Sequence, residues 1–376
     1  MIRSGARALP LAALVFAACG DERPSTPPIR FLHTFSPAET ELFNTTIAER
    51  GVAVESSLVP FARGQQVINE ILAAGGACPD LIRIDATWLP GLRAQLVPPP
   101  PELQSLDWTP EAAMLAQLDG AWWGVPQTVD GLIVIRDAAT PPPASSSVAD
   151  LVNAARAAKS EGRRYPLAVR VDGYWLLPWL RSEGADLAPD GIAGDNATHA
   201  MSAFAALYGD VAAPPPPAGS EAPDESRRWG AHEVAYWITG PWQLGALRDP
   251  ERVAVSAIEH APRGGQLLVV PKCAPRPADG WKLAGEITSV PFEATLSNAF
   301  RTVPTRQAAL AQAPALAQAA ATALKDASPL PRTVLTPLLF DDLNPALSAV
   351  VAGDATADEA IAGVRRGWSR IEKGSR

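Results

Sequence analysis

The sequence lacks several patterns that common enzyme classes require. It contains no GxSxG and no HExxH, so it has neither the nucleophile elbow of α/β-hydrolases nor the zinc-binding helix of many metalloproteases. Histidine is also scarce, and its members are scattered without the spacing of metal ligands. We therefore expect no metal, no cofactor and no enzymatic activity. The histidines are His33, His199, His232 and His260.

Long apolar runs and clusters of positive charge are missing as well. Beyond residue 18, no segment approaches the roughly 18 apolar residues of a membrane-spanning helix. The 32 Lys and Arg residues are outnumbered by 40 Asp and Glu, which gives a formal net charge of −8. This balance argues against a nucleic-acid partner and against a basic membrane-binding face. A chain of 376 residues, 47% hydrophobic and 19% charged, is instead typical of a globular protein with two domains.

Cysteine is rare, and the first of the three cysteines ends an export signal. Two arginines precede the apolar stretch 9–18, and Cys19 follows it directly. The apolar stretch is roughly half as long as a membrane-spanning helix, so this order predicts a signal peptide over residues 1–18. The segment 16–19, FAAC, resembles the lipobox of bacterial lipoproteins, which implies a lipid-modified Cys19 and a tether over residues 19–28. An ordinary secretory signal with an incidental cysteine is the alternative.

The two remaining cysteines, Cys78 and Cys273, are candidates for a disulfide. The compartment reached by an exported protein permits such a bond. Two buried free thiols are the alternative.

Tryptophan, in contrast, is abundant. The chain has 11 Trp against 4 Tyr and 9 Phe. Flat amphipathic rings suit a pocket that stacks on a sugar ring. Codon bias of a high-GC lineage would produce the same excess, so composition alone leaves both readings open.

Hydrophobic periodicity predicts alternating strands and helices. Residues 29–32 form a first strand, and Ser36 begins a helix with a capping box completed by Glu39. A strand over 52–58, a helix over 64–74 and a strand over 80–85 follow. This order predicts a parallel sheet covered by helices on both faces. The second half repeats the pattern, with helices over 147–162 and 197–208, a strand over 167–171 and a last helix from Thr356.

Four short motifs give the chain a resemblance to a known family. They are residues 83–90, RIDATWLP; 124–132, GVPQTVDGL; 240–242, GPW; and 343–347, LNPAL. In this order and spacing they resemble family 1 extracellular solute-binding proteins. These are the sugar-capturing lipoproteins of ATP-binding-cassette (ABC) importers, akin to maltose- and trehalose-binding proteins. The resemblance covers nearly the whole mature chain.

The resemblance implies a two-lobe α/β fold of the periplasmic-binding-protein type. Each lobe is expected to hold a mostly parallel sheet with helices on both faces, and three hinge crossings join the lobes. The ligand then lies between them. The implied boundaries are 29–129 plus 264–306 for lobe 1, and 130–263 plus 307–376 for lobe 2.

The resemblance also implies a set of ligand-binding residues. Asp130 matches an acidic position at the first crossing that binds sugar hydroxyls, and Trp242 matches an aromatic residue that stacks on the sugar. Asp85 and Trp88 match positions in the opposite lobe, and Tyr174 and Trp175 fall where a loop of the second lobe meets the ligand. Such residues suit a neutral polyol, because carboxylates and amides pair with hydroxyls while indoles cover C–H faces. The full expected set is His33, Thr34, Arg63, Asp85, Trp88, Gln127, Asp130, Tyr174, Trp175, Gly240, Trp242 and Gln266.

Each of these assignments has a structural alternative. Asp85 can cap the helix that begins near residue 87, and Asp130 can brace a hinge turn through backbone N–H groups. Trp242 and Trp88 can serve as core residues. His33, a lone histidine at the mouth of a strand, can be a hydrogen-bonded polar group without a ligand.

The function expected from the sequence is capture of a mono- or oligosaccharide. The protein would be an exported monomer, held at the outer face of the cell membrane by its lipid alone. It would deliver the sugar to the membrane subunits of an ABC permease through hinge closure. An exported hydrolase acting on glycosides through paired carboxylates is one alternative. A receptor of the same fold for a non-sugar solute, such as a polyamine, is another.

Overall fold

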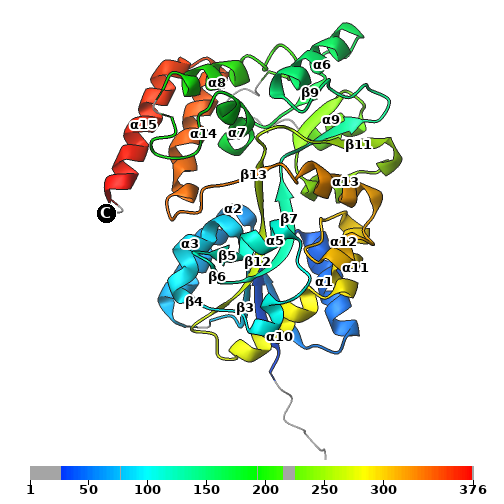
Figure 1. Cartoon of the computed structure of the whole chain (residues 1–376), viewed down its shortest axis with the longest axis vertical. Helices are drawn as coiled ribbons and strands as arrows, with labels where there is room; N and C mark the ends of the chain where they lie inside the picture. The colour runs from blue at the N-terminus through cyan, green and yellow to red at the C-terminus, as the bar shows by residue number, and fades with distance from the viewer. Residues whose placement is uncertain (1–26, 77, 193, 215–224, 375–376) are drawn as a thin grey trace, which may run out of the picture.

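The computed structural model describes residues 27–76, 78–192, 194–214 and 225–374. The predicted signal peptide, the lipidation site Cys19 and most of the predicted tether lie outside the described residues. Two lobes are stacked along the long axis of the molecule and joined by β-strands (Figure 1). A seven-stranded sheet forms the centre of lobe 1, and a four-stranded sheet forms the centre of lobe 2.

Lobe 1 is built from the N-terminal third of the chain and a later return segment. Its strands in order along the sheet are β13, β12, β3, β1 and β2, while β4 and β7 also pair with β12. Short 3₁₀ helices are labelled η. Its elements are β1 (Ile29–His33), α1 (Pro37–Glu49), β2 (Val54–Leu58), α2 (Phe61–Ala74), β3 (Leu81–Asp85), η1 (Ala86–Trp88), α3 (Leu89–Leu92), η2 (Arg93–Gln95), β4 (Leu96–Val97), α4 (Pro101–Gln104), α5 (Pro110–Ala116), β5 (Gln117–Leu118), β6 (Ala121–Trp122), β7 (Val125–Gly131), β12 (Pro262–Pro271), α10 (Pro277–Ile287), α11 (Val290–Phe300) and α12 (Gln307–Leu310).

Lobe 2 contains the middle of the chain and its C-terminal helices. Its sheet has the order β11, β8, β10, β9. Its elements are β8 (Ile133–Asp137), α6 (Val148–Ser160), β9 (Leu167–Ala168), α7 (Gly173–Ser182), α8 (Asn196–Ala205), α9 (Glu225–Gly230), β10 (Tyr236–Thr239), η3 (Pro241–Ala246), η4 (Pro250–Arg252), β11 (Val253–Ser256), α13 (Ala315–Ala323), α14 (Thr336–Ala352) and α15 (Ala357–Gly374); β13 (Ser328–Pro329) lies at the junction with lobe 1. None of the described helices is both long and apolar enough to cross a bilayer.

The two-lobe α/β fold is confirmed, but the expectation of mostly parallel sheets is wrong. In lobe 1, β1 is parallel to β2 and β3, whereas β12 is antiparallel to β3, β4 and β7. In lobe 2, β8 is antiparallel to both β10 and β11, and only the β9–β10 pair is parallel. The cause is the hinge: β7 leaves lobe 1 and β12 returns to it, so neighbouring strands that connect the lobes run in opposite directions.

Local sequence signals place several helices correctly. Ser36 and Glu39 form the capping box of α1, since Ser36 Oγ accepts from Glu39 N at 3.2 Å and Glu39 Oε2 accepts from Ser36 N at 2.7 Å. Gly75 ends α2 in the left-handed conformation, with φ of 61°. The expected strand over 167–171 shrinks to the two residues of β9. Helix α7 follows it, where a loop was expected.

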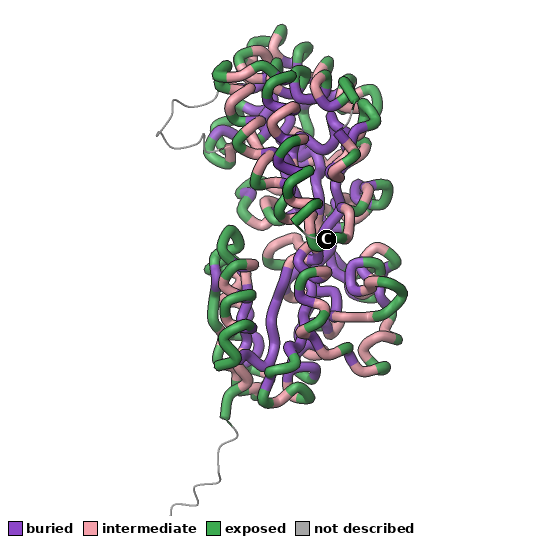
Figure 2. Tube along the Cα trace, turned by 90° about the vertical axis from the view of Figure 1, so that its left-hand side faces the viewer, coloured by how far each residue is buried: buried purple, intermediate pink, exposed green. Residues whose placement is uncertain are grey.

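The crossing between the lobes depends on a close approach of β7 and β12. Gly265 has φ of 159°, and a Cβ at this position would lie 2.2 Å from the carbonyl oxygen of Thr128. Only glycine fits this geometry. The buried part of the chain runs through this crossing from one lobe into the other (Figure 2). The strand register here sets Gly264 opposite Asp130 and Gln266 opposite Asp85.

The return segment of lobe 1 extends further than the expected boundary at residue 306. The backbone N–H of Gln307 donates to Asp107 O at 2.8 Å, and Gln307 Nε2 donates to Trp108 O at 3.0 Å. These bonds keep α12 in lobe 1. Helix α13 packs against β11 of lobe 2, so we place the third crossing between α12 and α13.

A disulfide joins Cys78 and Cys273, whose Cα atoms lie 5.9 Å apart. Cys78 precedes β3 and Cys273 follows β12. Because these two strands are antiparallel neighbours, the start of one lies beside the end of the other. Sheet register thus brings together two residues that are 195 positions apart in the chain.

Candidate functional site

A cluster of polar side chains lies where β3, β7 and β12 meet. Asp85, the last residue of β3, sits opposite Gln266 of β12, and Gln266 Nε2 donates to Asp85 Oδ2 at 3.1 Å. The other carboxylate oxygen of Asp85 accepts from Thr87 N at 2.8 Å and from Thr87 Oγ1 at 2.5 Å. Asp85 therefore caps η1, which was the alternative to a ligand-binding role in the sequence analysis. It also belongs to the polar cluster.

Arg83 organises one side of this cluster, and the sequence analysis did not select it. Its Nε donates to Gln127 Oε1 at 2.8 Å, its Nη1 donates to Thr34 Oγ1 at 2.8 Å, and its guanidinium lies 4.6 Å from the ring centre of Phe35. The side chain is buried. A sequence signal existed: Arg83 is two residues before Asp85, and alternate residues of a strand point to the same face.

Residues from both lobes meet above Gly264. A Cβ on Gly264 would lie 3.1 Å from Asp130 Oδ1 and 4.0 Å from Tyr174 Oη. Asp130 comes from the first crossing, whereas Tyr174 belongs to α7 of lobe 2. The Tyr174 hydroxyl donates to Pro262 O at 3.4 Å. Glycine at position 264 leaves space in front of the carboxylate and the phenol.

Burial makes this cluster electrostatically unusual. Burial, and next the neighbouring Asp85 carboxylate, raise the pKa of Asp130 to about 7, although Arg83 and the Gln266 amide oppose the shift. Burial also raises the pKa of Asp85 and that of Tyr174, where the Asp130 carboxylate adds to the effect. Among the described residues, neither Asp85 nor Asp130 forms an ion pair within 4.0 Å.

The lobe 2 side of the site is aromatic and is positioned by the start of α7. Asp172 caps this helix, with its Oδ1 accepting from Tyr174 N at 2.8 Å, and Gly173 N donates to Asn344 Oδ1 of α14 at 2.7 Å. Trp175 is buried, and its Nε1 donates to Ile238 O at 2.8 Å. Tyr174 and Trp175 therefore stand on a helix start and not on the expected loop. An aspartate at the cap position followed by apolar residues was the sequence signal for this helix.

Trp242 is the exposed member of this aromatic group. Its side chain is 44% exposed, and its ring centre lies 6.3 Å from that of Trp175 in an edge-to-face arrangement. The indole folds back over Gly240, where a Cβ would lie 2.0 Å from the ring. Gly240 thus provides room for the indole, and nearly half of the Trp242 side chain stays uncovered.

Comparisons with known proteins agree with this architecture. No protein-family model and no curated protein matches the chain. Among solved structures, the GacH receptor of Streptomyces glaucescens, known unliganded and with acarbose, is 21% identical with a TM-score of 0.77, over 93% of this chain and 99% of that one. Maltose-bound MalE3 of T. maritima is 18% identical with a TM-score of 0.79, over 92% and 100%. A solute-binding protein of Thermotoga lettingae, bound with alpha-D-tagatose, is 20% identical with a TM-score of 0.77, over the same shares.

The chain has the two-lobe fold of ABC solute-binding proteins.

Within this fold, three of the expected site residues lie apart from the polar cluster or have core surroundings. His33 is 1% exposed and packs among the rings of Phe31, Phe35 and Phe43. Its Nδ1 accepts from Phe35 N at 3.4 Å, and burial together with Arg83 lowers its pKa to about 4. The side chain is therefore neutral near pH 7.

Trp88 and Arg63 are the other two expected site residues that lie outside the polar cluster. Trp88 is 6% exposed, and its ring fills the space beside Gly64, 5.4 Å from the ring of Phe61. Arg63 lies on the exposed side of α2. Their roles as ligand contacts remain predictions, whereas Thr34, Asp85, Gln127, Asp130, Tyr174 and Gln266 are brought together.

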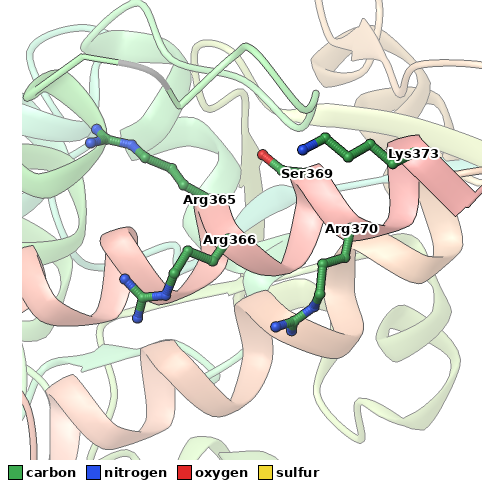
Figure 3. Close-up of a pocket in the computed structure, with 5 residues that line it drawn as sticks. All are labelled: Arg365, Arg366, Ser369, Arg370 and Lys373. Atoms are coloured by element: carbon green, nitrogen blue, oxygen red, sulfur yellow. The ribbon is translucent and has the colours of Figure 1, made fainter.

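Two surface hollows elsewhere involve none of these residues. One, of about 430 Å³, lies along α15 and is lined by four cations and a serine (Figure 3): Arg365, Arg366, Ser369, Arg370 and Lys373. The other, of about 260 Å³, lies beside α6 and includes Tyr236. The part of the chain that the structure describes contains no group of three or more His, Cys, Asp or Glu side chains arranged to hold a metal ion.

Proposed function

We propose that this protein captures a carbohydrate between its lobes and delivers it to the permease of an ABC importer. The observation that carries the proposal is the position of Asp130 and Tyr174, which face the same space above Gly264 from the crossing and from lobe 2. A ligand in this space touches both lobes at once. The solved structures with this fold, which include complexes with maltose, tagatose and acarbose, support the choice of a sugar.

The side chains of the site suit a sugar chemically. Sugar hydroxyls donate to carboxylates and to amide oxygens, and bonds to a charged acceptor are the stronger ones. Asp130 and Gln266 provide such acceptors, while the exposed indole of Trp242 provides a flat surface for the C–H faces of a pyranose. The site thus combines a few oriented polar groups with an aromatic wall.

The mechanism we propose is hinge closure. A ligand that contacts Asp130 on one side and Tyr174 or Trp242 on the other binds the closed form better than the open form. It therefore shifts the population toward closure by the difference in the two affinities. The permease would then recognise the closed form, and opening on the permease would release the sugar.

We also propose a location and a state for the protein. Export through the signal over residues 1–18 and lipid modification of Cys19 would hold it at the outer face of the membrane, within reach of permease subunits. It would act as a monomer, because one chain contributes both walls of the site. These points rest on the sequence motifs.

The experiment that tests this function is a sugar panel monitored by tryptophan fluorescence and by thermal shift. We expect a saturable fluorescence change and a rise in melting temperature with at least one mono- or oligosaccharide. Trp242→Ala should weaken binding about fivefold or more, since a stacked ring contributes roughly 1 kcal/mol beyond its burial, and Trp242→Phe should restore part of the affinity. Trp229→Phe, on the distant α9, should leave affinity unchanged. A folded protein that responds to no sugar in either assay would contradict the proposal.

A further inference from the structure

The candidate site holds more hydrogen-bond acceptors than donors. The Gln266 amide lies near two carboxylates: its Nε2 donates to Asp85 Oδ2 at 3.1 Å, and it also favours the ionised form of Asp130. The donor end of the amide is thereby used. Its acceptor end is not: Gln266 Oε1 is buried and has no hydrogen-bond partner within the described part of the chain. A buried acceptor without a donor costs free energy, which a ligand donor can recover.

The positive side chains nearby form hydrogen bonds with residues other than Asp85 and Asp130, although the charge of Arg83 still favours the ionised form of both. Arg83 uses Nε on Gln127 and Nη1 on Thr34. Arg181 of α7 is bound to Asp186 Oδ1 at 2.8 Å and to the carbonyl oxygens of the 328–329 segment. Neither arginine forms an ion pair with Asp85 or Asp130. His33, with its pKa lowered to about 4, adds no charge near neutral pH.

Further acidic groups make the surroundings more negative. Glu39 lies close enough to Arg83 to stabilise its charge, and Asp172 lies close enough to Tyr174 to raise the pKa of its phenol. The Tyr174 hydroxyl has already donated to Pro262 O. The space above Gly264 therefore faces the Asp130 carboxylate and a phenol whose hydroxyl is already used.

We propose that the guest is a carbohydrate that carries a protonated amine, with its ammonium group above Gly264, between Asp130 and Gln266 Oε1. This assignment rests on the proposed function and specifies its substrate class. An ammonium group brings three donors and no acceptor, so it satisfies the unpaired amide oxygen and forms a charge-assisted bond to Asp130. It also relieves the repulsion between the Asp85 and Asp130 carboxylates, which a neutral hydroxyl leaves in place. The exposed face of Trp242 is attractive to a cationic sugar as well.

Calorimetry with matched sugars tests this proposal at about pH 7.5, where Asp130, with its pKa of about 7, is mostly ionised and a substantial fraction of each amine is protonated. The probes are glucosamine, N-acetylglucosamine and glucose, and at the disaccharide level chitobiose, its diacetyl form and cellobiose. Putrescine and spermidine represent amines without a sugar. We expect the free-amine sugars of at least one set to bind tenfold or more tightly than both neutral analogues.

Two variants test whether the preference for amine-bearing sugars depends on Asp130. Asp130→Asn should reduce the preference for the amine to less than about threefold, while Asp107→Asn, a lobe 1 carboxylate paired with Arg306, should leave the preference intact. Retention of the full preference in Asp130→Asn would overturn the assignment of the ammonium position.

The remaining outcomes separate this inference from the proposed function. Neutral sugars that bind as tightly as the amines would overturn the cationic assignment and leave carbohydrate capture standing. Polyamines that bind while every sugar fails would overturn carbohydrate capture as well. A folded protein that binds no member of the three groups would contradict both.

Discussion

The two walls of the candidate site are built on different principles. On the lobe 1 side, polar residues such as Arg83, Asp85 and Gln266 are held by strand register and by hydrogen bonds to one another. On the lobe 2 side, aromatic residues are carried by the capped start of α7 and by η3. The first wall depends on residues far apart in the chain, while the second depends on local signals. This difference predicts which changes damage the site through the fold and which act locally.

The largest expected effect on stability concerns the disulfide of lobe 1. Replacing both Cys78 and Cys273 by serine should lower the free energy of unfolding by about 5 kcal/mol in the chain-entropy view, because the bond closes a loop between residues 195 apart. Denaturant titration of the double variant against the oxidised protein measures this. Reduction of the parent protein should give the same loss. Equal stability of oxidised and reduced protein would show that lobe 1 does not depend on the bond.

The next effect acts on the crossing. Gly265→Ala should cost about 3 kcal/mol or more, because the new Cβ would lie 2.2 Å from Thr128 O at φ of 159°. Gly91→Ala, where a Cβ would meet nothing within 4 Å, is the matched control and should be neutral. Thermal melting of both variants compares them. A fully stable Gly265→Ala protein would mean that β7 and β12 can separate without cost.

The pH dependence of stability tests the burial of Asp130. Its pKa in the folded protein is about 7, against about 4 in the unfolded chain. The folded state therefore binds more protons between these values, so this group lowers stability as pH rises from about 4 to about 7. Relative to the parent, Asp130→Asn should gain stability across that range, by about 2 kcal/mol in all for a partly buried carboxylate.

The check is the difference in unfolding free energy between the two proteins, measured at intervals of pH. It should grow up to about pH 7 and then become constant. A difference that is independent of pH would contradict the raised pKa. Glu293, whose pKa burial raises to about 8, contributes equally to both proteins and cancels.

The smallest effect concerns the local wall of lobe 2. Asp172→Ala should cost about 1 kcal/mol through loss of the cap on α7, and should weaken ligand binding because Tyr174 loses its fixed position. Asp195→Ala is the control, since Asp195 precedes α8 without a capping side-chain bond, and it should change neither property. Chemical denaturation and ligand titration measure the two. Equal losses in both variants would argue against a special role for the α7 cap.

Much of the fold could be predicted because its signals are local. The Ser36–Glu39 capping box begins α1, Gly75 ends α2, and Ser147 caps α6. The strand pairing could not be read in the same way. Whether β12 runs parallel or antiparallel to β3 depends on the path of the chain through the other lobe, and no residue of either strand records it. The helix α7 was missed because the residues after Asp172 were assigned to a loop.

The residues of the candidate site likewise fall into those that the sequence predicted and those that only distant contacts reveal. The family resemblance implied that Asp85, Asp130, Tyr174 and Gln266 bind the ligand, and the structure brings these four residues together. Arg83 was overlooked, because its importance comes from Thr34 and Gln127, which lie 49 and 44 positions away. His33 was selected for its place at the mouth of a strand, whereas its ring lies among phenylalanines.

The sequence alone determined where most helices and strands begin and which residue types gather at strand ends, and it is the basis for predicting an export signal. These properties depend on neighbouring residues, and neighbours are visible in a sequence. Only the tertiary structure decided which side chains share the space above Gly264, which of their donors are already used, and that the buried Gln266 amide oxygen has no hydrogen-bond partner among the described residues. Those properties depend on contacts between distant segments and on exclusion of water, and both arise only when the lobes and their crossing are assembled.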